Sequence, residues 1–206
     1  GDAVAVVVAK DRYQAADALA AIDVDYEQLP AVVDMPAALQ HGSTLVHDDV
    51  PNNRCFTFNE EHGDYAATTQ GEDIVVVKRS FINQRLIPSA MEPRAVVAQH
   101  NLGTGELTVW SATQVPHFVR IFLSLNIGVP EQHIRVIAPD VGGGFGSKLE
   151  IYAEEILVPL LAQKLGAPVK WTESRNEGFP ATNHGRDLSQ NVEISATRGG
   201  KVKGLK

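Results

Sequence analysis

Cysteine is almost absent from this sequence: Cys55 is the single one in 206 residues. One thiol excludes an intrachain disulfide framework. It also excludes a four-cysteine iron–sulfur or zinc site built from this chain alone. A chain without disulfides fits a reducing compartment, so we expect a cytoplasmic protein.

Long apolar runs and an excess of positive charge are missing as well. The longest apolar stretches, residues 3–9 and 156–162, are far shorter than the ~20 residues that span a bilayer. With no signal peptide visible, we expect no transmembrane segment. The net charge is −7, and nucleic-acid binding needs a density of Lys and Arg that displaces counterions. Nucleic acid is therefore not an expected partner.

The sequence does contain enough apolar residues, 44%, for a sizeable core. Its length suits one large domain or two small ones. It begins with Gly1 rather than Met, directly before an apolar run, and residues 201–206 resemble a strand just beginning. We therefore expect a fragment of a larger subunit.

Residues 1–30 predict a β-α-β arrangement. The valine-rich residues 3–9 suggest a buried strand, Asp11 suits the N-cap of a helix, and residues 24–29 alternate as a second strand. A short helical turn is expected at residues 36–39. Turn-forming residues then predominate from 42 to 67, a loop too long for the interior of one compact domain.

The remainder predicts an α/β to α+β fold with a mixed sheet and two main helices. Gly128 and Gly166 are placed to end the two helices. The expected helices are residues 116–126 and 150–165, and the expected strands are residues 74–78, 80–86, 94–100, 106–113, 134–138, 169–172 and 191–197.

Residues 142–148 (GGGFGSK) are the segment that indicates chemistry. Glycines before a helix expose backbone N–H groups, which favours an anionic ligand. A phosphate-binding P-loop and a dinucleotide fingerprint both fail at Ser147, and Leu149 replaces the hydroxyl that would bind Mg²⁺. Phe145 either fills the core or forms the wall of a pocket for a flat ligand.

Several segments, in this order, resemble the large subunits of molybdenum hydroxylases. That family includes xanthine dehydrogenase, aldehyde oxidoreductase and aerobic carbon monoxide dehydrogenase. The resemblance covers essentially the whole chain, and residues 184–187 (HGRD) are most similar to the carbon-monoxide-dehydrogenase-like branch. The segments are GDAVAVVVA (1–9), YEQLPAVVD (26–34), MEPR (91–94), TQ (113–114), GGGFGSK (142–148) and WTESR (171–175).

The resemblance implies a domain order. Residues 1–45 would be the end of an N-terminal α/β hammerhead-type domain and residues 46–66 a linker. Residues 67–206 would be the first part of the molybdopterin-binding domain, with its mixed sheet.

The resemblance also implies a cofactor and partners. The cofactor would be molybdenum–molybdopterin, in bacteria often as the cytosine dinucleotide, in an oxidoreductase acting on carbon monoxide, an aldehyde or another carbon substrate. Electrons would pass to an Fe–S small subunit and an FAD medium subunit, in a dimer of heterotrimers. The scarcity of cysteine agrees with clusters on other chains. A non-catalytic binding or assembly module on the same scaffold is the alternative.

The resemblance assigns site residues one by one. The amide of Gln114 would donate to a cofactor oxygen without adding charge. Two structural alternatives remain open. Gln114 could simply form a hydrogen bond to the backbone, and Glu92 could be a buried, paired carboxylate. The expected cofactor contacts are Gln114, Gly143, Gly144 and Phe145, and the expected substrate-channel candidates are Phe145, Glu92, His184 and Arg186.

For the segment around His184 and Arg186, a solvated loop with an Arg186–Asp187 pair is the alternative. Arg175 is expected to pair with Glu173 or another carboxylate.

No metal ligand and no catalytic base is expected within this chain. The family's general-base glutamate lies near the far C-terminus of the subunit, so we expect it downstream and expect no turnover by this chain alone. Xanthine-oxidising members carry a glutamate directly after the loop lysine. Leu149 stands at that position here, which argues against a purine substrate.

Overall fold

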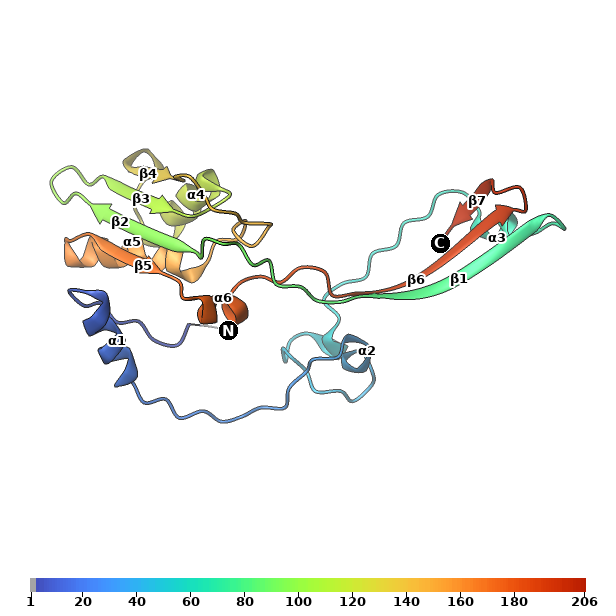
Figure 1. The fold of residues 1–206 in the computed structure, drawn as a ribbon, viewed down its shortest axis with the longest axis horizontal. Helices are drawn as coiled ribbons and strands as arrows, with labels where there is room; N and C mark the ends of the chain where they lie inside the picture. The colour runs from blue at the N-terminus through green and yellow to red at the C-terminus, as the bar shows by residue number, and fades with distance from the viewer. Residues whose placement is uncertain (1–2) are drawn as a thin grey trace. The chain divides into compact units, whose positions relative to one another are not determined.

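The computed structural model describes residues 3–206, which form two compact units (Figure 1). The larger unit contains Ser80–Gln190 and the N-terminal residues as far as Leu19. The other contains Ala20–Arg79 and Asn191–Lys206. The loop that indicates chemistry lies in the larger unit.

The larger unit is built on a mixed four-stranded sheet in the order β4-β3-β2-β5. Strand β2 (Ala95–His100) is antiparallel to β3 (Leu107–Ser111) and to β5 (Val169–Thr172). Strand β3 is parallel to β4 (Ile134–Ile137). Because parallel neighbours need a crossover, helix α4 (Pro116–Ile127) and the short η2 (Glu131–His133) connect β3 to β4.

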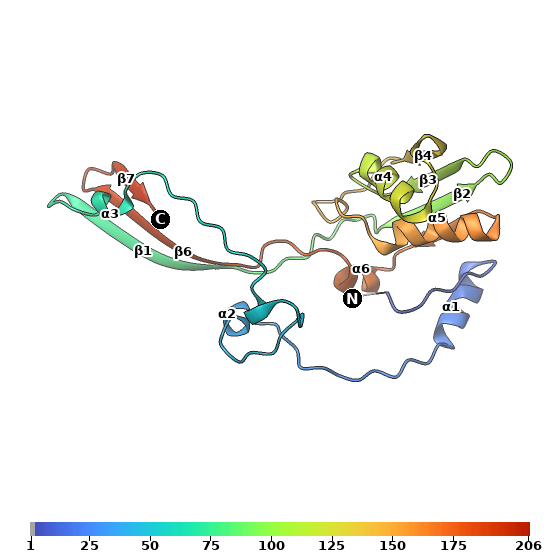
Figure 2. The ribbon, with the colours of Figure 1, turned by 180° about the vertical axis from the view of Figure 1, so that it is seen from behind.

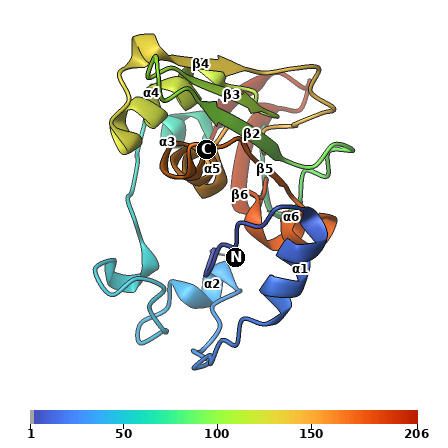
Figure 3. The same cartoon turned by 90° about the vertical axis from the view of Figure 1, so that its left-hand side faces the viewer.

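Two helices, α4 and α5 (Ala153–Leu165), cover one face of this sheet (Figures 2 and 3). Both end at a glycine in the left-handed region, with φ of 73° at Gly128 and 62° at Gly166. Alternate strand residues point at the helices, and burying each apolar side chain of this size contributes about 1.5–3 kcal/mol. The core residues are Val96, Ala98, Leu107, Val109, Val119, Leu123, Val129, Ile134, Val158 and Ala162.

The smaller unit contains most of a three-stranded sheet in the order β1-β6-β7. Its strands are β1 (Ile74–Asn83), β6 (Leu188–Thr197) and β7 (Val202–Leu205), and its short helical segments are α2 (Met35–Ala38), η1 (Pro51–Asn53) and α3 (Tyr65–Thr68). Helix α3 packs on β7 at Gly204, where a Cβ would lie 2.3 Å from Oγ1 of Thr68. No helix among residues 3–206 is long and apolar enough to cross a membrane.

The β-α-β arrangement expected at the N-terminus does not form. Helix α1 (Arg12–Ala20) is present, and Asp11 accepts hydrogen bonds from the first N–H groups of its helix. Residues 3–9 and 24–29 form no strand; Val4 and Val6 are 64% and 52% exposed. A strand needs a neighbour that binds its backbone groups, and an apolar pattern does not supply one. The hammerhead-type assignment and the boundaries at residues 45 and 67 stay predictions, and residues 1–2 lie outside the described residues.

The other predicted elements are present, with shifted ends. Residues 74–78 and 80–86, expected as a long strand or hairpin arm, form the long strand β1, which ends at Asn83 rather than residue 86. Helix α5 begins at Ala153 rather than residue 150, because the Glu155 carboxylate accepts the N–H of Tyr152 and fixes the helix start there. The glycine loop is therefore separated from the helix by a short turn. Helix α6 (Arg175–Ala181), which begins with a capping box of Ser174 and Glu177, was not predicted from the sequence.

Candidate functional site

The loop at residues 142–146 takes a backbone path that glycine permits. Gly143 and Gly146 have φ of 97° and 93°, in the left-handed region. Phe145 has φ of 54°, which costs a residue with a side chain about 1–2 kcal/mol. Its side chain does not fill the core, because the residue is 77% exposed. Of the two interpretations of Phe145, the structure excludes the core one.

Gln114 supports the loop from the end of β3. Its Oε1 accepts a hydrogen bond from Gly146 N–H at 3.1 Å, and its backbone N–H donates to the Lys148 carbonyl at 2.9 Å. At Gly144 a Cβ would lie 2.3 Å from the same Oε1, so only glycine allows this approach. Since an N–H donor faces Oε1, the amide nitrogen is directed elsewhere, and it meets no acceptor within residues 3–206.

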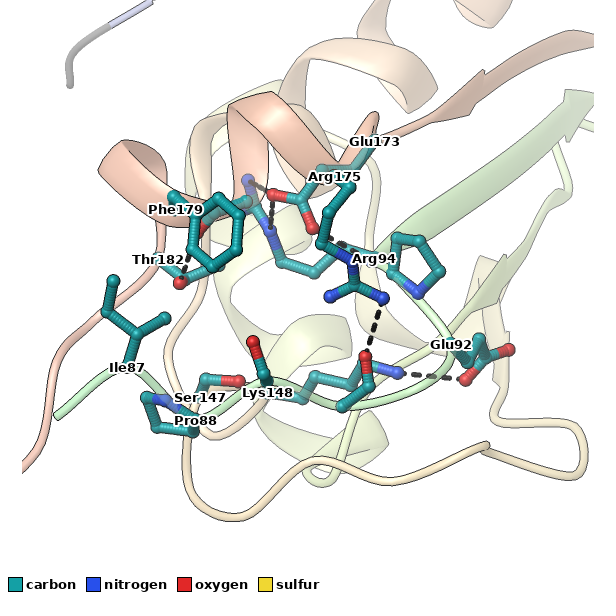
Figure 4. Close-up of a pocket in the computed structure, with 14 residues that line it drawn as sticks. Ile87, Pro88, Glu92, Arg94, Ser147, Lys148, Glu173, Arg175, Phe179 and Thr182 are labelled. Atoms are coloured by element: carbon teal, nitrogen blue, oxygen red, sulfur yellow. Dashed lines mark hydrogen bonds and ion pairs between the residues drawn. The ribbon is translucent and has the colours of Figure 1, made fainter.

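Glu92 holds the other arm of the loop. Its Oε2 accepts a hydrogen bond from Gly142 N–H at 2.7 Å. The same oxygen accepts a second bond from Nζ of Lys148 at 2.8 Å (Figure 4). Burial acts to raise the pKa of Glu92, but the hydrogen bonds from Lys148 and Gly142 and the lysine charge outweigh it and lower that pKa. An ionised carboxylate with two donors is a clamp rather than a proton acceptor. Of the alternatives for Glu92, the paired one matches the geometry, although its side chain is 34% exposed.

Three consecutive backbone donors of the loop remain without a protein partner. Within the described residues, no acceptor meets the N–H of Gly143, Gly144 or Phe145. Successive N–H groups in a chain that alternates between right- and left-handed conformations form a concavity that binds anions and oxygen atoms. Gly144 is itself a buried residue, and buried N–H groups are rarely left unsatisfied. The loop thus offers N–H donors to a ligand rich in oxygen.

A pocket is lined by residues between Ile87 and Arg94, by Ser147 and Lys148 just after the loop, and by residues of α6 and its flanks (Figure 4). Its charged lining is formed by Glu92, Lys148, Arg94, Glu173 and Arg175. Neither Gln114 nor Phe145 lines it. The pocket is therefore lined by other residues than Gln114 and the three that carry the loop donors.

Arg94, to which the sequence pattern assigned no site role, is the most heavily paired side chain of this pocket lining. Its Nε and Nη2 donate to Oε1 of Glu173 at 2.9 and 2.8 Å, and its Nη1 donates to Glu154 at 3.0 Å. The expected pairing of Arg175 with Glu173 or another carboxylate was therefore wrong for the described residues. Arg175 instead donates to the carbonyls of Ala90 and Met91, at 2.8 and 3.1 Å. Glu173 pairs with Arg94 because their backbones are also joined. The N–H of Glu173 donates to the Arg94 carbonyl at 2.9 Å.

Among the described residues, no hydrogen bond or ion pair joins His184 or Arg186 to the loop at residues 142–146. Nδ1 of His184 accepts from Nε of Arg85 at 2.5 Å, which leaves the proton on Nε2 to donate to the Phe179 carbonyl at 2.8 Å. Both ring nitrogens are thus occupied. The alternative Arg186–Asp187 pair does not form either, since Asp187 lies 3.9 Å from Arg85. Arg186 is exposed, with φ of 69°.

Comparison with known proteins identifies the family in which these features occur. Residues 46–206 match the family model of the molybdopterin cofactor-binding domain. The carbon monoxide dehydrogenase large chain of Afipia carboxidovorans is 39% identical, over 98% of this chain and 27% of that protein. Two solved structures are similar. Reconstituted CO dehydrogenase from Oligotropha carboxidovorans has a TM-score of 0.84 and 38% identity, over 96% of this chain and 26% of that one. Quinoline 2-oxidoreductase from Pseudomonas putida 86 has a TM-score of 0.86 and 36% identity, over 96% and 25%.

The mixed sheet and the glycine loop are thus those of a molybdopterin cofactor-binding domain. The chain belongs to the family of molybdopterin-binding large subunits that includes those of carbon monoxide dehydrogenase and xanthine dehydrogenase. It spans about a quarter of the length of the carbon monoxide dehydrogenase large chain.

Proposed function

We propose that residues 143–145 and Gln114 form one wall of a molybdenum–molybdopterin site in an oxidoreductase large subunit. The observation that carries the proposal is the set of three consecutive loop N–H groups without a protein acceptor, beside the free amide nitrogen of Gln114. The cofactor is rich in oxygen atoms, and these donors match it without adding charge. The residues present therefore fit the group that the family binds.

The protein residues have separate tasks in this proposal. Gln114 would donate through Nε2 while its Oε1 stays bound to Gly146. Gly144 lets the loop approach that amide, and the exposed ring of Phe145 would form an apolar wall that excludes water from the substrate side. When bound, the cofactor supplies the redox chemistry by which a substrate carbon is oxidised with oxygen from water.

The substrate and partners of the whole subunit are part of the same proposal. We propose carbon monoxide or an aldehyde as the substrate class, and Leu149 argues against a purine. The cofactor would be the cytosine dinucleotide form. An Fe–S small subunit and an FAD medium subunit would accept the electrons, in a cytoplasmic dimer of heterotrimers. The single cysteine, Cys55, agrees with clusters on other chains.

The test is the cofactor content of the full-length subunit that carries this sequence, purified natively with its partner chains. Metal analysis should find molybdenum in near-stoichiometric amount, together with pterin released on denaturation. The outcome that excludes the proposal is a folded subunit with neither molybdenum nor pterin, which would instead indicate a non-catalytic module on this scaffold.

A further inference from the structure

Tyr152 connects two segments that are distant in sequence, the glycine loop and residues 183–187. Its hydroxyl donates to the carbonyl of Ser147 at 2.5 Å and accepts the N–H of Asn183 at 3.1 Å. We propose that Tyr152 is a positioning residue, which holds the cofactor-facing loop and the segment that contains His184 in a fixed relation. The role toward the cofactor rests on the function proposed above.

The contacts of Ser147 carry the effect of this hydroxyl into the loop. Ser147 donates to the Gly144 carbonyl through both its N–H, at 3.0 Å, and its Oγ, at 2.9 Å. The next residue, Lys148, accepts the backbone N–H of Gln114 through its carbonyl. A hydroxyl that fixes the Ser147 carbonyl therefore also fixes the peptide between Ser147 and Lys148. These two residues form the hydrogen bonds to Gly144 and to Gln114.

The ring of Tyr152 is itself held in place. It lies over the Arg94 guanidinium, with 3.9 Å between the Cζ and the ring centroid, and Arg94 is anchored by Glu173 and Glu154. A cation is attracted by the electron-rich face of an aromatic ring, and this contact holds the ring against Arg94. Burial also raises the pKa of Tyr152, so the hydroxyl keeps its proton and remains a donor at neutral pH.

The backbone of Tyr152 has a different task from its hydroxyl. Its N–H and carbonyl pair with Glu155 at the start of α5. A phenylalanine would retain these bonds and the stacking on Arg94. Tyr152→Phe therefore removes only the link between Ser147 and Asn183, and Tyr65→Phe is a matched control, because the hydroxyl of Tyr65 contacts Glu193 in the other compact unit.

The experiment compares hydrogen–deuterium exchange and the Mo(V) electron paramagnetic resonance spectrum of the full-length, cofactor-loaded subunit with those of the two variants. In Tyr152→Phe, exchange should accelerate about five- to tenfold in peptides covering residues 142–149 and also 182–187, the factor expected for loss of one hydrogen bond. The Mo(V) g values should shift while molybdenum content stays unchanged, and Tyr65→Phe should alter neither segment nor spectrum.

Three outcomes overturn the inference: unchanged exchange in both segments, acceleration in one segment alone, or a uniform acceleration throughout the β2–β5 sheet with an unchanged Mo(V) spectrum. The last would mean that the hydroxyl only stabilises the fold. Failure of the proposed function is recognised separately, because a wild-type subunit without molybdenum would leave the exchange comparison valid while removing the spectrum.

Discussion

Nζ of Lys148 lies 2.8 Å from Oε2 of Glu92, and that same oxygen accepts the N–H of Gly142. One carboxylate thus joins the first residue of the glycine loop to the lysine that follows it. With Gln114 bound to Gly146, the loop is fixed at both arms by side chains from two other segments. The donors of residues 143–145 are consequently held in place by protein contacts alone, which reduces the entropy lost when a ligand binds.

The Glu92–Lys148 clamp predicts a specific pH dependence. The pKa of Glu92 is lower in the folded protein than in the unfolded chain, so its stabilising contribution is present above the unfolded value, about 4.3, and is lost as pH falls through the folded value. In Glu92→Gln this contribution is absent. The melting-temperature difference between wild type and variant should be largest near pH 6 and shrink between about pH 5 and pH 3. A difference that stays constant or grows on acidification would contradict the clamp.

Gly144→Ala should disrupt the site through a steric clash with Gln114. The added Cβ would lie 2.3 Å from Oε1, and overpacking of this kind costs about 1–3 kcal/mol. Gly199→Ala is the matched control, since its Cβ would meet nothing closer than 3.8 Å. Thermal unfolding should show the loss for Gly144→Ala alone, and Gln114→Ala should restore part of it in the double variant. Equal stability of the two single glycine variants would rule out the close approach.

Gln114→Glu separates the two halves of the amide. The carboxylate can still accept from Gly146 N–H, but it has no proton to donate at neutral pH. We predict at least tenfold lower turnover with normal exchange protection of the Gly146 amide, the size expected for loss of one preorganised donor. Gln99→Ala, on an exposed position of β2, should be neutral. Full turnover by Gln114→Glu in the intact enzyme would show that Nε2 is not used.

Arg94→Met should be the most destabilising of these substitutions. It leaves Glu173, whose side chain is 4% exposed, as an unpaired buried carboxylate, and such losses cost about 3–5 kcal/mol. Arg120→Met is the matched control, because the Arg120–Glu131 pair is about half exposed and worth under about 1 kcal/mol. Urea unfolding should show this contrast, and adding Glu173→Met to Arg94→Met should recover stability. A similar effect of both arginine variants would contradict the network.

Part of this architecture was predictable from sequence because its cause is local. Alternating apolar residues in β2 and β3, and the glycines that end α4 and α5, specify those elements by their own pattern. The capping box of Ser174 and Glu177 was also present, but Gly178 and Pro180 obscured the helix α6 that follows it. The strands expected at residues 3–9 and 24–29 failed because a strand depends on a partner, which its own pattern cannot reveal.

The site was predictable only as far as its motif. The position of residues 142–148 followed from the sequence, and the family resemblance predicted that Gln114 and this loop face the same cofactor. The hydrogen bond between Gln114 and Gly146 was not predicted, except as the alternative of a backbone-bonded glutamine. Which carboxylate Arg94 would take could not be predicted, because Glu173 and Glu154 lie 79 and 60 positions away along the chain. The contacts of the Tyr152 hydroxyl could not be predicted from the sequence either. Both partners are backbone groups, so the residue types at those positions do not indicate the contact.

Residues 143–145 and Gln114 should face the cofactor in the natively purified, full-length subunit, and an experimental structure of that subunit would show whether they do. We predict oxygen atoms of the molybdopterin cofactor or its metal centre within about 3 Å of the loop N–H groups and of Nε2 of Gln114, the ordinary length of such hydrogen bonds. A cofactor bound elsewhere in the subunit, with these four donors facing solvent or protein, would contradict the account.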